Sequence, residues 1–150
     1  MVSRGKRSAG RFDAFRLAAE QGVAEGNVDA HALPRIANLL SDGPATIGWR
    51  IEGFTDVSGR PALRIALKGA VSLTCQRCLA DFVWPVDHAT EVLLAHDEEE
   101  VAALDAVSSL EVVHASGPTD PLALVEDELL LTLPFAPRHP EGACDGTIIQ

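Results

Sequence analysis

The sequence predicts a single α+β domain, a mainly antiparallel curved sheet or open barrel with one early and one late helix. Two segments, residues 45–54 and 62–75, alternate apolar and polar residues as half-buried strands do. A Gly-containing turn joins them, which is typical of an antiparallel hairpin. Helical spacing of apolar residues appears near residues 31–40 and again from residue 121 onward. These observations together favour a sheet packed against helices.

The first elements precede the hairpin. Residues 22–30 are predicted to form a short strand, and residues 31–40 have apolar residues at helical spacing, which predicts the early helix. The sequence SDGP at residues 41–44 is a turn signal and ends that helix.

The hairpin has one apolar side on each strand. In the first strand, Arg50 and Glu52 point away from that side, and in the second strand Gly69 predicts a bulge or bend. The predicted inward-facing residues of the two strands are Ile47, Trp49, Ile51, Leu63, Ile65 and Leu67.

The middle of the chain continues the sheet. Residues 81–96 predict one or two further strands, with Pro85 marking an edge or a break. Residues 97–106 are acidic enough for a solvated loop or a short surface helix, and residues 110–115 predict another strand.

The late helix has clear boundaries. Asp120 is a good N-cap, Pro121 suits the first helical position, and the helix is expected to end before Pro134. The apolar stripe predicted to face the core contains Leu122, Val125, Leu129 and Leu133.

Three consecutive acids lie in this helix. Glu126 falls inside the apolar stripe, whereas Asp127 and Glu128 lie away from it and are expected to face solvent. Either Glu126 reaches water at the margin of the stripe, or it pairs with Arg138, His139 or a buried backbone amide, since burying a lone carboxylate is costly.

The length, the hydrophobic content and the net charge of the chain limit which functions are possible. A chain of 150 residues that is 47% hydrophobic suits one domain with a real core, and its net charge of -10 argues against binding nucleic acid over the whole surface. Residues 1–11 are predicted to be a disordered basic arm, followed by one domain at residues 12–150. The arm either contacts RNA or a partner, or is simply a solvated end; its basic residues are Arg4, Lys6, Arg7 and Arg11.

No window resembles a membrane span, and no hydrophobic segment follows the basic start, so we expect a soluble, cytoplasmic protein. Three cysteines are an odd number, which fits reduced thiols or metal ligands better than a closed set of disulfides.

Cysteine spacing suggests a metal site. Cys75 and Cys78 form a CxxC pair, and His139 and Cys144 supply two further ligands. A Cys3His set suits a structural zinc with no open coordination position. The alternative is that Cys75 is an inward-facing strand residue and Cys144 a thiol near the chain end.

The pair also raises a redox alternative, a thiol oxidoreductase. That chemistry favours a CxxC pair at a helix N-terminus beside a parallel sheet, whereas this pair follows a hairpin strand. No phosphate-binding glycine loop, nucleophile elbow or HExxH motif is present, so we expect no enzyme and no small-molecule substrate.

Two motifs carry a family resemblance. TCQRCLADF and DPLALVEDELLLTLPFAPRH, followed by a last cysteine, resemble the YceD family, proteins linked to accumulation of large-subunit ribosomal RNA. The resemblance runs from about Phe12 to Cys144. The matching positions are Cys75, Arg77, Cys78, Leu79, Glu126, Asp127, Glu128, Pro134, Pro137, His139 and Cys144.

The resemblance implies a non-enzymatic ribosome-biogenesis factor. Its expected partners are the precursor particle of the large subunit, a ribosomal protein or ribosomal RNA. The acidic body suits a basic protein better than naked RNA. Apart from the thiol oxidoreductase, a metal-stabilised interaction module unrelated to ribosomes remains a second alternative.

Overall fold

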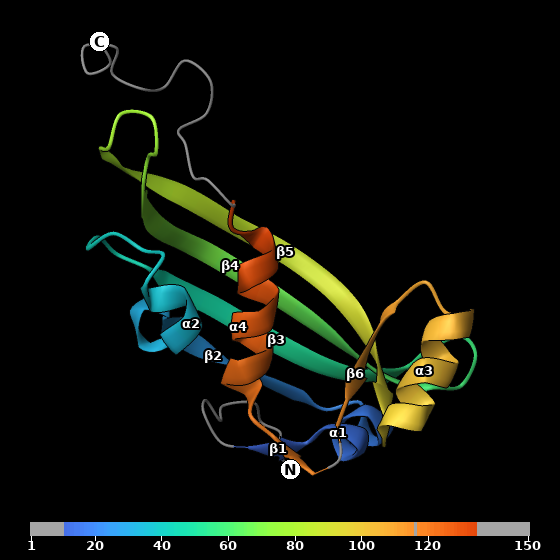
Figure 1. Ribbon diagram of the computed structural model, residues 1–150. Helices are drawn as coiled ribbons and strands as arrows, with labels where there is room; N and C mark the ends of the chain where they lie inside the picture. The colour runs from blue at the N-terminus through green and yellow to red at the C-terminus, as the bar shows by residue number, and fades with distance from the viewer. Residues whose placement is uncertain (1–10, 116, 135–150) are drawn as a thin grey trace.

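The computed structural model describes residues 11–115 and 117–134 and has the predicted α+β class. Figure 1 shows a five-stranded sheet that is strongly curved but open, so it does not close into a barrel. The strand order is β2-β3-β4-β5-β6, and a separate pair joins β1 to β7. The strands are β1 (Phe12–Asp13), β2 (Val23–Asp29), β3 (Thr46–Thr55), β4 (Pro61–Thr74), β5 (Asp81–Ala95), β6 (Glu111–His114) and β7 (Pro118–Thr119).

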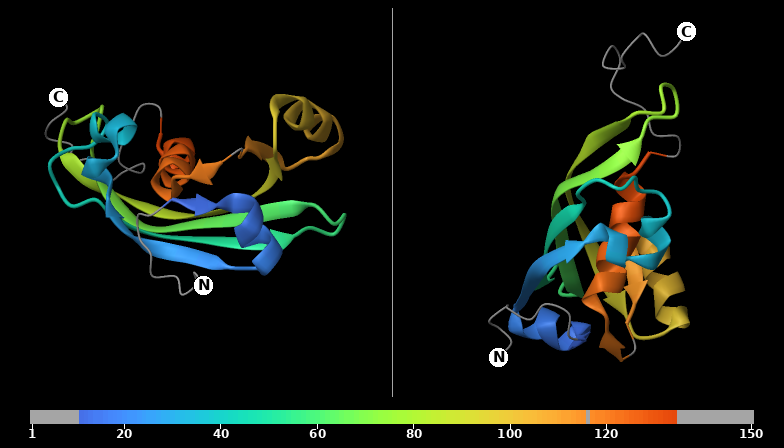
Figure 2. Two further views of the ribbon diagram at one scale, coloured as in Figure 1. Left: turned by 90° about the horizontal axis from the view of Figure 1, so that it is seen from below. Right: turned by 90° about the vertical axis from the view of Figure 1, so that its left-hand side faces the viewer.

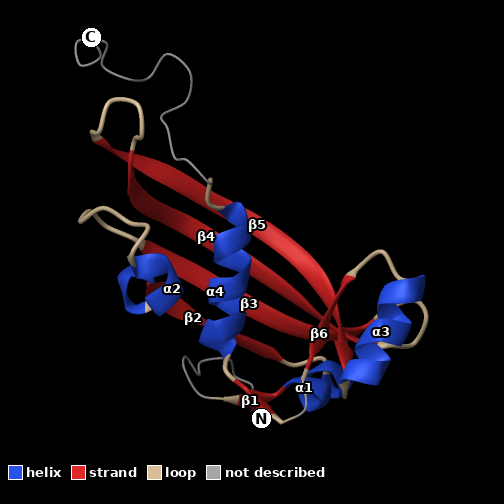
Figure 3. Ribbon diagram, viewed as in Figure 1, coloured by secondary structure: helices blue, strands red, loops and turns tan. Residues whose placement is uncertain are grey.

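Helices gather on one face of the sheet, and Figure 2 shows that no described helix covers the opposite face. Figure 3 separates helices from strands by colour, and α4 crosses the strands on the covered face. We call the covered face the inner face and the opposite face the outer face. The helices are α1 (Ala14–Glu20), α2 (Pro34–Ala37), α3 (Glu98–Val107) and α4 (Pro121–Thr132), with a 3-10 turn η1 at Ala30–Ala32.

The predicted hairpin is confirmed as β3 and β4, paired antiparallel from Ile47 opposite Gly69 to Thr55 opposite Pro61. Alternation places one side chain of every two on the inner face. Each fully buried aliphatic side chain contributes about 1.5–3 kcal/mol relative to exposure. The core at this hairpin consists of Ile47, Trp49, Ile51, Leu63, Ile65 and Leu67.

Glycine shapes the sheet at two positions. Pairing of β4 with β5 continues without an inserted residue through Gly69, so the predicted bulge is not present there, and a Cβ atom at this position would collide with the backbone carbonyl of Thr46. Gly53 lies on the inner face, where a Cβ atom would collide with the backbone carbonyl of Leu17 in α1. The missing side chain therefore lets α1 lie directly on β3.

The strand containing Pro85 is a single element, β5, and it is not broken there. Beyond β4, β5 has a described neighbour only at its end, where Val92–Ala95 pairs in parallel with β6. Pro85 therefore lies on an edge, as predicted, because an edge position loses no ladder hydrogen bond. The parallel pairing of β6 with β5 was not predicted. Parallel strands need a crossover connection, and α3 provides it between β5 and β6.

The early helical region is shorter than predicted. Residues 31–40 contain the end of η1 and the four-residue α2, not one continuous helix. Pro34 explains the interruption, since the residue before proline avoids the helical region and Leu33 has an extended backbone. A helix that the sequence analysis missed, α1, begins after Asp13, whose side chain accepts a hydrogen bond from the Arg16 amide.

The late helix is confirmed. Asp120 caps it by accepting a hydrogen bond from the Leu122 amide, Pro121 occupies its first turn, and Leu133 ends it with an extended backbone. The acidic segment after β5 forms α3, which has no buried residue and begins with Asp97 as its N-cap. None of the described helices is long and apolar enough to cross a membrane.

Candidate functional site: the cysteine turn and the acidic helix

The cysteine pair lies in the turn between β4 and β5, which we call the cysteine turn (residues 75–80). Two backbone hydrogen bonds close it: the Cys75 amide donates to the Ala80 carbonyl at 2.9 Å, and the Leu79 amide donates to the Cys75 carbonyl at 2.8 Å. A third contact runs from the Arg77 amide to the Cys75 Sγ at 3.4 Å. These three contacts fix the shape of the turn and the position of the Cys75 side chain within it.

Both cysteines are buried, Cys75 fully and Cys78 nearly so. The turn joins two antiparallel strands, so the pair does not lie at the start of a helix, the arrangement that a redox CxxC pair favours. The predicted partners His139 and Cys144 lie outside the described residues. Within residues 11–115 and 117–134, no group of three or more His, Cys, Asp or Glu side chains is placed to hold a metal.

Helix α4 places its consecutive acids on different flanks. At 3.6 residues per turn, positions 126 and 128 point about 200° apart around the helix. Glu126 faces α2, and Glu128 faces β5. Asp127 lies between them and stays exposed, as predicted.

Glu126 is buried and held by Arg35. The carboxylate accepts a hydrogen bond from the Arg35 backbone amide at 2.6 Å and pairs with the guanidinium Nε at 3.2 Å. A backbone amide therefore satisfies Glu126, as one predicted alternative had it, but this amide belongs to the exposed residue Arg35 and the bond is only partly buried. The other predicted partners, Arg138 and His139, lie outside the described residues.

Arg35 also pairs with Asp127, whose carboxylate lies 2.6 Å from Nη2. Asp127 first and Glu126 second raise the pKa of the Arg35 guanidinium above its ordinary value. One arginine on α2 therefore contacts two acids of α4.

The expectation that Glu128 faces solvent is wrong. Its side chain is 5% exposed, and its Oε1 lies 2.8 Å from the Nε2 of His88 in β5. The helical wheel failed because it assumed one covered stripe, whereas α4 lies across a curved sheet that also covers its flank. The buried residues of α4 are Pro121, Leu124, Val125, Glu126, Glu128 and Leu129.

The two basic partners of these acids, His88 and Arg35, were not predicted. A period-two signal for His88 exists, because it shares a side of β5 with the buried residues Val86 and Val92. No local signal identifies Arg35, whose partner Glu126 lies 91 residues away in the chain.

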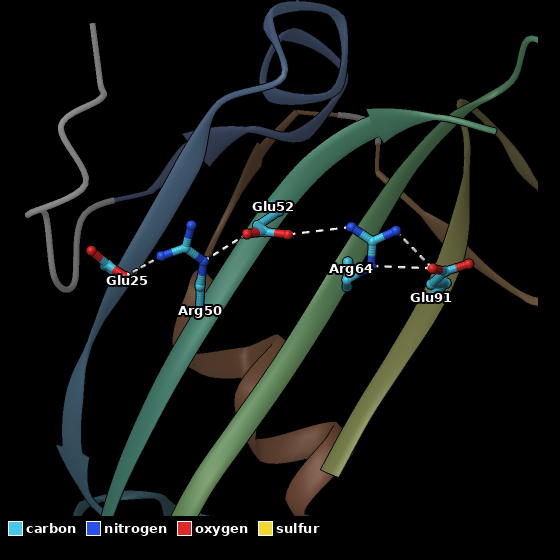
Figure 4. A network of polar contacts seen from close by, with 5 residues as sticks. All are labelled: Glu25, Arg50, Glu52, Arg64 and Glu91. Atoms are coloured by element: carbon cyan, nitrogen blue, oxygen red, sulfur yellow. Dashed lines mark hydrogen bonds and ion pairs between the residues drawn. The ribbon is translucent and has the colours of Figure 1, made fainter.

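The outer face carries a row of charges that was also not predicted (Figure 4). Arg50 in β3 lies 2.9 Å from Glu25 in β2 and 2.7 Å from Glu52 in its own strand. Arg64 in β4 lies 3.3 Å from Glu52 and 2.9 Å from Glu91 in β5. The row therefore alternates in sign across four strands.

The row leaves little positive field on the outer face. Arg50 first, with Arg64 contributing, holds the pKa of Glu52 below its ordinary value. Three carboxylates surround two guanidinium groups, so these arginines are already neutralised and do not attract phosphate. A groove of about 590 Å³ beside the row is equally mixed, lined by Glu25, Asn27, Gly48, Arg50, Lys68 and Asp87 among others.

Other predicted contact residues lie at the start of the chain. Arg11 is exposed and directly precedes β1. Arg4, Lys6 and Arg7 lie outside the described residues, so their predicted contact with RNA or a partner stays a prediction.

Comparison with known proteins identifies the family. No solved structure matches the chain at a significant level. The family model described as large ribosomal RNA subunit accumulation protein YceD matches residues 63–149, more than half of the chain. The match starts later than the predicted resemblance, but it covers the cysteine turn and all of α4. The chain therefore belongs to the YceD family.

Proposed function

We propose that this protein is a non-enzymatic, cytoplasmic ribosome-biogenesis factor that supports accumulation of large-subunit ribosomal RNA. The observation that carries the proposal is the family match at residues 63–149. The cysteine turn and the acid-bearing α4 both lie inside the match.

The direct partner in this proposal is a protein of the large-subunit precursor particle. From residue 81 to the end the chain has fifteen acids and one base, and the two arginines in the charge row of the outer face are neutralised. Such a surface favours a basic ribosomal protein over bare RNA. RNA is reached through the basic residues of the arm, Arg4, Lys6, Arg7 and Arg11.

Sedimentation tests the role. Tagged protein in a cell extract is expected to comigrate with precursors of the large subunit on a sucrose gradient. A protein found only at the top of the gradient contradicts the proposal. A pulldown dominated by an unrelated complex would favour the interaction module instead.

The proposal includes a structural zinc bound by Cys75, Cys78, His139 and Cys144. Two buried sulfurs in one tight turn, one of them facing a backbone amide, supply half of a Cys3His set. Such a metal fixes shape and has no open position for a reactant.

Elemental analysis of protein purified without added metal tests this part. The wild-type chain is expected to contain about one zinc and the Cys78→Ser variant to lose it. Zinc in neither protein contradicts the site. A thiol oxidoreductase would instead reduce insulin disulfides, and loss of that activity in Cys78→Ser would contradict the non-enzymatic proposal.

A further inference from the structure

The cysteine turn presents a leucine that the described fold does not use. Leu79 is 72% exposed and its backbone φ is 65°, in the left-handed region. Position 79 needs this conformation, because the Leu79 amide closes the turn on the Cys75 carbonyl. Glycine adopts it freely, whereas a leucine side chain there is strained and gains no burial within the described residues.

The other non-glycine residue with positive φ in the described chain has an ordinary explanation. Gln21 ends α1, and its amide donates to carbonyls of the last helical turn. It is also a polar residue at the surface. Leu79 is therefore the position at which a strained backbone and an exposed apolar side chain coincide, a combination typical of binding sites.

Arg77 lies two residues before Leu79 and is a cation without an acidic partner among the described residues. Most described basic side chains are paired with acids: Arg16, Arg35, Arg50, Arg60 and Arg64. Arg77 is exposed at the turn, while its backbone amide contacts Cys75 Sγ. The backbone of this residue thus serves the turn and leaves the guanidinium available.

We infer that Leu79 and Arg77 form a docking knob that enters an apolar pocket, bordered by a carboxylate, on a partner protein. The pocket accepts the leucine, and the carboxylate pairs with the guanidinium. This inference rests on the proposed function and names the surface that contacts the precursor particle.

A protein fits this knob better than RNA. RNA offers phosphates and flat bases, which suit clusters of cations and aromatic platforms. Arg77 is a lone cation here, and Asp81 follows closely in the chain. Strand addition to the neighbouring edge of β5 is disfavoured, because Pro85 lacks an amide hydrogen to donate.

Binding of labelled protein to purified large-subunit precursor particles tests the knob. Leu79→Gly is expected to weaken binding at least about tenfold while leaving the urea midpoint equal or higher, since glycine relieves the strain. The control Val57→Ser changes a fully exposed residue in the β3–β4 turn and is expected to bind like the wild type.

Charge reversal distinguishes the specific pair from general attraction. Arg77→Glu is expected to weaken binding at least about tenfold, whereas Lys68→Glu, which reverses an exposed cation on β4, is expected to change it less than about twofold. Equal losses for the two variants would indicate nonspecific attraction to RNA and overturn the inference.

A photo-cross-linker at position 79 identifies the occupant. The expected product joins it to a peptide of a precursor-particle protein, and Arg77→Glu reduces its yield. Cross-links to RNA, or to residues 135–150 of the same chain, overturn the inference. If the wild type binds the particles and Leu79→Gly binds them equally well, the knob alone is refuted. If the wild type does not bind the particles, the proposed function and the knob are refuted together.

Discussion

The Nε2 atom of His88 lies 2.8 Å from Oε1 of the buried Glu128, which joins the middle of β5 to α4. His88 is a partly buried residue of the inner face, and Glu128 is almost fully enclosed. This contact and the Arg35 pair fix opposite flanks of α4. The orientation of the helix across the sheet therefore depends on acids whose partners come from distant segments.

Removing the His88 imidazole is expected to destabilise the fold. His88→Ala leaves the Glu128 carboxylate buried without its partner, which costs about 1–3 kcal/mol of unfolding free energy. Urea denaturation measures this. The control His114→Ala removes an exposed imidazole and is expected to cost less than about 0.5 kcal/mol. Equal effects of the two variants would show that the His88 contact does not hold α4.

Glu126 and Asp127, neighbours in α4, are expected to contribute very different amounts to the free energy of unfolding. Glu126→Ala removes a buried carboxylate and leaves the Arg35 amide, in a partly buried contact, without this acceptor, and it is expected to cost about 1–3 kcal/mol. Asp127→Ala removes an exposed pair with the same arginine and is expected to cost less than about 1 kcal/mol. If Asp127→Ala is the more damaging change in urea denaturation, the assignment of the two roles is wrong.

Glu111 is expected to make stability depend on pH. Partial burial of its carboxyl, and then repulsion from neighbouring acids, raise the pKa of Glu111 above its ordinary value of 4.5; these acids are Glu128, Asp127 and Asp105. A raised folded-state pKa means that the ionised group opposes folding at neutral pH and that the penalty is relieved as pH falls through that pKa.

Glu111→Gln is therefore expected to raise the urea midpoint at pH 7. The difference from the wild type should vanish below the ordinary pKa of 4.5, where the carboxyl is protonated in folded and unfolded chains alike. A variant that is less stable than the wild type at pH 7 would contradict the repulsion.

The charge row on the outer face is expected to make a small, salt-sensitive contribution. Glu52→Gln interrupts the row between its two arginines and is expected to cost less than about 1 kcal/mol at neutral pH. Because the folded-state pKa of Glu52 is depressed, this stabilisation exists above its ordinary value of 4.5 and is lost as pH falls through the folded pKa.

Urea denaturation of Glu52→Gln at low salt and in about 1 M NaCl checks this expectation, because screening weakens exposed pairs. Glu20→Gln, which removes an exposed pair with Arg16 on α1, is the matched control and is expected to have a still smaller effect. A cost for Glu52→Gln that salt does not reduce would contradict an electrostatic origin.

The elements that the sequence predicted best are those with strong local patterns. Period-two alternation identified β3 and β4, and Asp120 with Pro121 identified the start of α4. The sequence predicted the structure less well where contacts between distant segments determine the length of an element or the pairing of a strand. The α2 region is cut short by Pro34, and β6 pairs in parallel through a crossover that no local signal reports.

The same distinction applies to the candidate site. The cysteine turn followed from its spacing, whereas the helical wheel placed Glu126 within the apolar stripe and left open whether it is buried or reaches water; the structure buries it. The burial of Glu128 did not, since it requires knowing that His88 of β5 passes beneath that flank of α4. Partners that lie far apart in the chain carry no local signature.

We propose that the protein supports accumulation of large-subunit ribosomal RNA. The decisive measurement for this proposal is the ratio of large-subunit to small-subunit ribosomal RNA in cells depleted of the protein. The ratio is expected to fall on depletion and to recover when the wild-type chain is restored. A ratio that depletion leaves unchanged would contradict the claim.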